Sequence, residues 1–156
     1  MTGSNGSGDQ GLAAAFGPGS IAVGVAAADW REAVAAAADL LVASGRVEPS
    51  YGAACIEAVE RLGPYIVIAP GIALAHAKPT TAMTHSPGLS LAVLAEPVEF
   101  GNRANDPVRL VFALAATDHD SHIELMSAFA ERMGDQDCVN SLLNARSAEE
   151  IRTLLS

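Results

Sequence analysis

The stretch at residues 63–79 constrains the fold of this chain most, because apolar segments alternate there with turn residues and end on a histidine. Residues 65–69 are apolar and rich in β-branched side chains, which predicts a short buried strand. Pro70 and Gly71 indicate a turn, after which a second apolar segment runs to His76. We therefore expect the scaffold to hold an imidazole at the end of a buried segment.

His76 has two interpretations on the residues alone. A histidine that follows an apolar run is commonly a hydrogen-bonded structural residue. An imidazole that a buried strand holds at the protein surface can instead take up and release a group reversibly, since its nitrogens titrate near neutral pH. The residues leave both interpretations open.

Three other apolar segments predict strands, and they alternate with amphipathic segments that predict helices. The strands are expected at residues 21–25, 89–95 and 108–116. The helices are expected from an N-cap at Asp29 to about Gly45, from Pro49 to about Leu62, from an N-cap at Ser121 to Gly134, and over residues 137–144 and 147–155. This alternation predicts a single α/β domain.

Composition limits the classes of protein to consider. With 156 residues the chain has room for one domain, which we expect at residues 20–156, after a disordered tail rich in Gly, Ser and Ala at residues 1–19. The tail has neither the basic residues nor the apolar core of a secretory signal. No apolar run reaches the roughly 20 residues of a membrane helix, so we expect a soluble protein without membrane insertion.

Charge and cysteine usage narrow the partners and the compartment. A net charge of -9 argues against nucleic acid and anionic membranes as partners, and it suits a basic protein partner. Cys55 and Cys138 are far apart in the sequence, so neither a disulfide framework nor a zinc site is indicated. A reducing cytoplasm fits best, with Cys55 in the core.

A second candidate residue, His122, follows the apolar strand at residues 108–116. If Asp120 or Ser121 caps the next helix, His122 lies in its first turn, where free N–H groups and the helix dipole favour an anion. It is equally compatible with an ordinary polar residue at a helix start.

Both stretches resemble motifs of the enzyme IIA component of the sugar phosphotransferase system (PTS), in the mannitol/fructose class and closest to its ascorbate-type branch. The first family motif reads Gly-Pro-Tyr, an apolar strand, Pro-Gly, and an apolar segment that ends in Pro-His, a small residue, a basic residue and proline. The chain matches it over residues 63–79, with Ala75 in place of the proline before His76. The second motif, Asn-Asp-Pro-Val, an apolar strand and a later histidine, matches residues 105–122.

The resemblance implies a mixed β-sheet flanked by helices and gives roles to four residues. His76 would accept and donate a phosphoryl group, and His122 would donate a hydrogen bond to its oxygens. Lys78 matches the basic residue of the motif, and Arg61 resembles an arginine of the mannitol branch at a spacing that differs by one. Both cations are also compatible with a solvated surface. No metal and no cofactor are implied, since phosphoryl transfer depends mainly on positioning and hydrogen-bond donors.

The implied function is that of a phosphotransferase with a phosphohistidine intermediate. The chain would be a cytoplasmic phosphocarrier that takes the phosphoryl group from the histidine phosphocarrier protein onto His76. It would pass the group to the cysteine of a IIB component for uptake of an ascorbate-type carbohydrate, with IIB and the membrane IIC component on separate polypeptides. The apolar surface around His76 is compatible with a partner protein or with a homodimer.

Two alternatives stay open at this point. A regulatory protein could keep the same fold and bind partners according to its phosphorylation state. A metal-dependent enzyme could use His119 and His122 with Asp118, Asp120 or His76, although no complete ligand motif is present. We expect His119 to precede the helix as a loop residue, and we expect His85 to be a solvated loop histidine.

Overall fold

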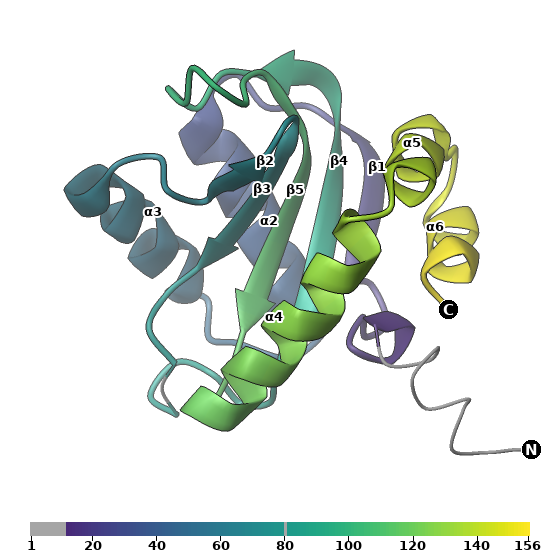
Figure 1. Cartoon of the computed structure of the whole chain (residues 1–156). Coiled ribbons are helices and arrows are strands. Elements are labelled where there is room, and N and C mark those ends of the chain that lie inside the picture. The colour runs from purple at the N-terminus through teal and green to yellow at the C-terminus, as the bar shows by residue number, and fades with distance from the viewer. Residues whose placement is uncertain (1–11, 80) are drawn as a thin grey trace, which may run out of the picture.

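Five strands form one mixed sheet in the order β1-β4-β5-β3-β2 (Figure 1). The computed structural model describes residues 12–79 and 81–156. The pairs β1–β4 and β3–β5 are parallel, whereas β4–β5 and β2–β3 are antiparallel. The strands are β1 (Ile21–Val25), β2 (Val67–Ala69), β3 (Ile72–His76), β4 (Gly88–Val98) and β5 (Val108–Ala115).

Helices cover both faces of this sheet. One face packs against α2 (Trp30–Ala43) and α3 (Tyr51–Leu62), and the other packs against α4 (His119–Met133), α5 (Gln136–Asn144) and α6 (Ala148–Leu155). In Figure 1, α2 passes behind the sheet and α4 crosses in front of it. The predicted α/β domain with a mixed, helix-flanked sheet is therefore confirmed. None of the described helices combines the length and the hydropathy needed to cross a bilayer.

The central strands are mostly apolar because each of them supplies side chains to both cores. In β5, Leu110, Phe112 and Leu114 pack towards α4, while the alternate residues pack towards α2 and α3. In β3, Leu74 faces the α4 side and Ala75 faces the α2 side. Because side chains alternate along a strand, His76 emerges on the same side as Leu74, towards α4.

The start of α4 differs from the prediction. Its N-cap is Asp118, and a reciprocal capping box joins the Asp118 carboxylate to the Ser121 N–H, and the Ser121 hydroxyl to the Asp118 N–H. The predicted N-cap at Ser121 is therefore wrong, and His119 is the first helical residue instead of a loop residue. Asp118 is the N-cap because its backbone is extended, so its carboxylate can accept a hydrogen bond from the Ser121 N–H, whereas Ser121 lies inside the helix.

The predicted disordered tail is wrong for residues 12–19, whereas residues 1–11 lie outside the described part of the chain. Leu12 and Phe16 are buried in the core on the α4 side, and the Phe16 ring packs edge-on against Phe112 with centroids 6.4 Å apart. The Arg152 guanidinium also donates to the carbonyl of Gly17 at 2.8 Å. Buried apolar side chains and hydrogen bonds from Arg152 thus dock a segment that its composition alone did not predict to be ordered.

A Phe16→Ala variant will therefore lose stability. Phe16 is only 2% exposed, and removal of a buried aromatic ring typically costs about 3 to 5 kcal/mol in the free energy of unfolding. Urea denaturation followed by circular dichroism measures this loss. A Leu62→Ala variant is the control, because Leu62 is 63% exposed and its truncation leaves little cavity. Equal midpoints for Phe16→Ala and wild type would contradict the docking of this segment.

Candidate active site

His76 is the last residue of β3, half-buried at the C-terminal end of this strand. Its Nδ1 lies 2.9 Å from the carbonyl oxygen of Leu74. Because a carbonyl only accepts hydrogen bonds, this contact places the proton of a neutral imidazole on Nδ1. The other nitrogen, Nε2, then carries a free lone pair, which is the form that a nucleophile needs.

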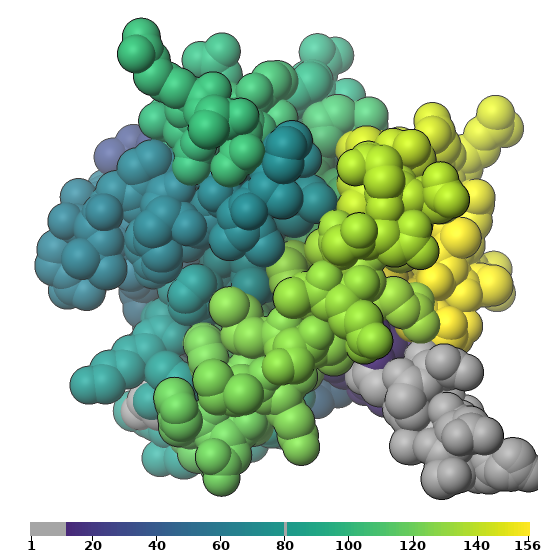
Figure 2. All heavy atoms as spheres, viewed as in Figure 1, coloured from purple at the N-terminus to yellow at the C-terminus, as the bar shows by residue number. Residues whose placement is uncertain are grey.

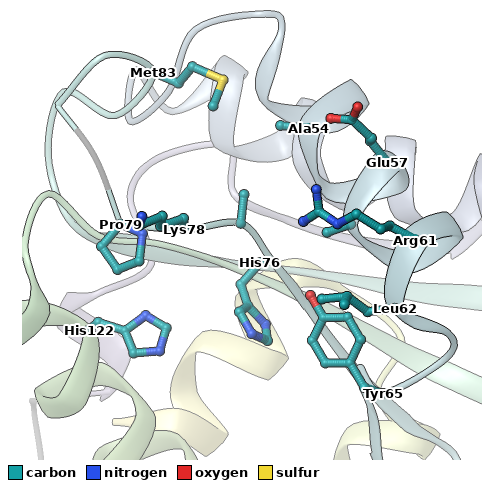
Figure 3. A pocket seen from close by; sticks show the side chains of 12 residues that line it. Ala54, Glu57, Arg61, Leu62, Tyr65, His76, Lys78, Pro79, Met83 and His122 are labelled. Atoms are coloured by element: carbon teal, nitrogen blue, oxygen red, sulfur yellow. The ribbon is translucent and has the colours of Figure 1, made fainter.

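Two aromatic rings flank the imidazole of His76. The Tyr65 ring contacts it edge-on, with centroids 5.5 Å apart and planes at 87°, and the His122 ring contacts it with centroids 5.7 Å apart and planes at 60°. Figure 3 shows His76 between these two side chains. Tyr65 comes from the loop before β2 and His122 from α4, so three separate segments meet at the imidazole of His76.

The surroundings of His122 favour a neutral imidazole that donates a hydrogen bond. Burial lowers the pKa of its imidazole below the ordinary value of 6.5, and the neighbouring His76 and His119 lower this pKa further. Its Nδ1 is buried and has no hydrogen-bond partner among the described residues. A proton on that atom would be a buried donor without an acceptor, so the neutral tautomer carries its proton on Nε2.

The pKa of His122 is directly measurable. We expect an NMR titration to give a value below 6.5, and we expect His76→Asn to raise it only partly, because burial is the larger cause. Since the folded protein then binds fewer protons than the unfolded chain, the free energy of unfolding falls as the pH drops from 6.5 towards this lowered pKa. A His122 pKa at or above 6.5 would contradict the neutral-donor assignment.

A pocket of about 510 Å³ opens beside His76, between α3 and the loop that follows β3. Arg61, Lys78, Tyr65, His76 and His122 all line it, and in Figure 3 the guanidinium of Arg61 points into it from α3. Within the part of the chain that the structure describes, neither Arg61 nor Lys78 forms an ion pair. The structure thus brings all four residues singled out in the sequence to one cavity, with two cations available to an anion.

The remaining histidines lie away from this pocket. His119 is exposed at the start of α4, and His85 is exposed and pairs with the Glu48 carboxylate at 2.6 Å. Among the described residues, no three or more His, Cys, Asp or Glu side chains group closely enough to hold a metal ion. The geometry therefore offers no support for the metal-enzyme alternative.

Sequence reasoning missed two tyrosines. Tyr65 was expected inside a strand, but β2 begins only at Val67, and the Tyr65 ring is free to contact His76. Tyr51 falls in the helix expected from Pro49 to about Leu62 and was given no role in the site, yet its hydroxyl bonds two strand ends beside His76. The available signal was the hydroxyl itself, because a buried tyrosine must find a hydrogen-bond partner.

The expected core position of Cys55 is confirmed, and burial raises the pKa of its thiol to about 12.

The chain is similar to known proteins over most of its length. The model of the family described as "Phosphoenolpyruvate-dependent sugar phosphotransferase system, EIIA 2" matches residues 15–156. The ascorbate-specific PTS system EIIA component of Salmonella choleraesuis is 38% identical over 137 residues, which cover 87% of this chain and 88% of that protein.

Solved structures agree with this match. The mannitol-specific cryptic phosphotransferase enzyme IIA CmtB of Escherichia coli superposes with a TM-score of 0.82 at 30% identity, covering 93% of this chain and 97% of that one. The mannitol enzyme IIA of Escherichia coli, solved in complex with its phosphorylated enzyme IIB, gives a TM-score of 0.77 at 28% identity, covering 89% of this chain and 95% of the matched chain.

Proposed function

Because the chain belongs to the EIIA 2 family of the phosphoenolpyruvate-dependent sugar phosphotransferase system, we propose that His76 is its phosphoryl carrier. His76 takes the group from the histidine phosphocarrier protein and passes it to the cysteine of a IIB component. The observation that carries this proposal is the bond from Nδ1 to the Leu74 carbonyl, which leaves Nε2 as the nucleophilic nitrogen beside His122.

The transfer needs no change of protonation at the attacking atom. The Nε2 lone pair of His76 forms the new N–P bond while the N–P bond of the donor phosphohistidine breaks, and the released electron pair stays on the donor imidazole. The proton stays on Nδ1 throughout and keeps its hydrogen bond to the Leu74 carbonyl. Transfer to the IIB cysteine breaks the same bond at His76 and forms an S–P bond.

Three side chains are available to stabilise the charge on the phosphoryl oxygens. His122 donates from Nε2, and Arg61 and Lys78 supply positive charge from the walls of the same pocket. Donors that are already in place are worth most where charge develops in the transition state. Arg61 also offers a planar pair of donors that can bind two phosphoryl oxygens together.

Partner proteins have an apolar surface to dock on around this pocket. Among the described residues, the large hydrophobic side chains that are most exposed are Leu62, Tyr65, Ile68 and Ile123. Leu62, Tyr65 and Ile68 come from the segment that precedes β3, and Ile123 follows His122 on α4. In Figure 2, α4 (green) lies beside that segment (teal) on one face of the molecule. The mannitol relative is itself solved bound to phosphorylated IIB, which supports a IIB component as the partner.

An Ile123→Glu variant tests this docking surface. Ile123 is 50% exposed, so the change should leave the fold intact while it places a carboxylate in an apolar contact. We expect the half-saturating concentration of IIB to rise by about tenfold, as for a typical central interface residue. Thr153→Glu, an exposed position on α6, adds the same charge elsewhere. Equal effects of both variants would contradict a local docking surface at Ile123.

Reconstitution tests the function and the substrate class together. Phosphoenolpyruvate, enzyme I and the histidine phosphocarrier protein are incubated with this chain and with either an ascorbate-type or a mannitol-type IIB. We expect phosphocysteine on the ascorbate-type IIB, formed only when this chain is present, because its curated relatives are ascorbate-specific. Transfer to the mannitol-type IIB alone would overturn the substrate class, and transfer to neither would overturn the phosphocarrier function.

A further inference from the structure

The hydrogen-bond pattern between β3 and β5 shows where their ladder stops. Ala75 pairs with Ala113 and His76 with Leu114, and the Leu110 N–H donates to the Gly71 carbonyl at 3.1 Å. In a parallel ladder such bonds repeat every second residue. If the ladder continued by one more hydrogen bond, or rung, the N–H of Ala77 would donate to the carbonyl of Leu114.

The hydroxyl of Tyr51 occupies that rung. It accepts the Ala77 N–H at 3.1 Å and donates to the Leu114 carbonyl at 2.7 Å, so one oxygen atom is inserted between the two strand ends. Tyr51 is the first residue of α3 and is only 1% exposed. Burial raises the pKa of this hydroxyl well above its ordinary value, so the proton that it donates is always present.

We propose that Tyr51 is a positioning residue for phosphoryl transfer, because its hydroxyl fixes the backbone on the C-terminal side of His76. The inference rests on the proposed function of His76. The chain leaves the sheet at Ala77, and the inserted oxygen sets how far Ala77 stands from β5. The imidazole is thus held from two sides, by Leu74 at Nδ1 and by Tyr51 through the neighbouring peptide.

Removal of the Tyr51 hydroxyl can change the strand ends in two ways, and both affect His76. Either Ala77 moves towards Leu114 and closes the rung directly, or the half-buried N–H of Ala77 and the buried carbonyl of Leu114 lose their partner. Closure displaces the residue that carries the nucleophile, and an unpaired rung loosens it. In-line transfer is sensitive to such changes, since a misplacement of about 1 Å can lower a rate by about a hundredfold.

Tyr51→Phe is the test, with Ser90→Ala as the matched control. Each variant removes one buried hydroxyl that bonds a distant carbonyl, and the Ser90 hydroxyl bonds Ala37 of α2 at 2.6 Å. We expect Tyr51→Phe to lower the maximal single-turnover rate of phosphoryl uptake by about ten- to a hundredfold, with an unchanged half-saturating concentration of the phosphocarrier protein. Ser90→Ala should lose stability without losing this rate.

NMR supplies a readout that does not depend on the reaction. In Tyr51→Phe we expect shifted ring nitrogen signals of His76 and faster hydrogen exchange at the Ala77 amide, and in wild type we expect a slowly exchanging Tyr51 hydroxyl proton close to that amide. Should Tyr51→Phe not fold, the absence of that hydroxyl proton in wild type would overturn the inserted rung. A folded Tyr51→Phe with wild-type rate and unchanged His76 signals would overturn the positioning role.

The two proposals fail in different ways. A wild-type protein that takes up no phosphoryl group would defeat the phosphocarrier function, while the NMR comparison would still test whether Tyr51 fixes His76. A wild-type protein that is phosphorylated while Tyr51→Phe and Ser90→Ala lose rate equally would defeat only the role of Tyr51.

Discussion

A His76→Asn variant will fold and take up no phosphoryl group. The asparagine amide can keep the hydrogen bond to the Leu74 carbonyl that Nδ1 of the imidazole makes, but it has no nucleophilic nitrogen. Loss of uptake from the radiolabelled histidine phosphocarrier protein should therefore be complete, whereas the melting temperature should change little because His76 is only half-buried.

His85→Asn is the matched control for this variant. His85 is exposed, and its imidazole pairs with the Glu48 carboxylate away from the pocket, so its replacement should leave phosphoryl uptake at the wild-type rate. Label that persists on His76→Asn, or that disappears on His85→Asn, would show that another histidine carries the group.

A His122→Ala variant will still be phosphorylated, but slowly. Removal of one preorganised donor to developing negative charge typically lowers a rate by about a hundred- to a thousandfold. His122→Gln should recover part of this loss, because the glutamine amide can donate from near the position of Nε2. Rapid-quench measurement of single-turnover uptake gives these rates.

His119→Ala is the control on the same helix. His119 is exposed and is absent from the pocket, so its replacement should change the rate only slightly, through its small influence on the pKa of His122. Equal rates for His122→Ala and wild type would contradict a donor role. A loss equal to that of His76→Asn would instead make His122 indispensable for phosphorylation itself.

Local sequence was sufficient for the strands and helices of the sheet layers. The doubly buried strand β5 follows from its apolar run, which only Arg109 interrupts, and the N-cap of α2 follows from Asp29, whose carboxylate accepts the Glu32 N–H. The start of α4 was harder, since Asp118, Asp120 and Ser121 are all good caps and only the backbone geometry selects Asp118.

The site was predictable only as far as side-chain types and their order along the chain. The sequence singled out His76 and His122, and the fold brings their rings together across β3 and α4. The inserted hydroxyl of Tyr51 depends on long-range contacts of 26 residues to Ala77 and 63 residues to Leu114. Such contacts depend on how α3 packs on the sheet, which local patterns do not encode.

Ala75 stands where the family motif has proline, and it fits the regular structure of β3. Ala75 is fully buried and pairs with Ala113, so β3 continues without interruption up to His76. A proline at this position would lack an N–H donor, whereas alanine keeps it. We therefore predict that phosphoryl transfer is retained, with slightly less preorganisation of His76.

The most direct test of the account is to locate the phosphoryl group on the wild-type protein. The chain is incubated with phosphoenolpyruvate, enzyme I and the histidine phosphocarrier protein, and its intact mass and its fragment masses are then recorded. We predict one acid-labile phosphoryl group, and we predict that it lies on His76. An unchanged mass with active partners present, or a phosphoryl group on any other residue, would contradict the central claim that His76 is the carrier.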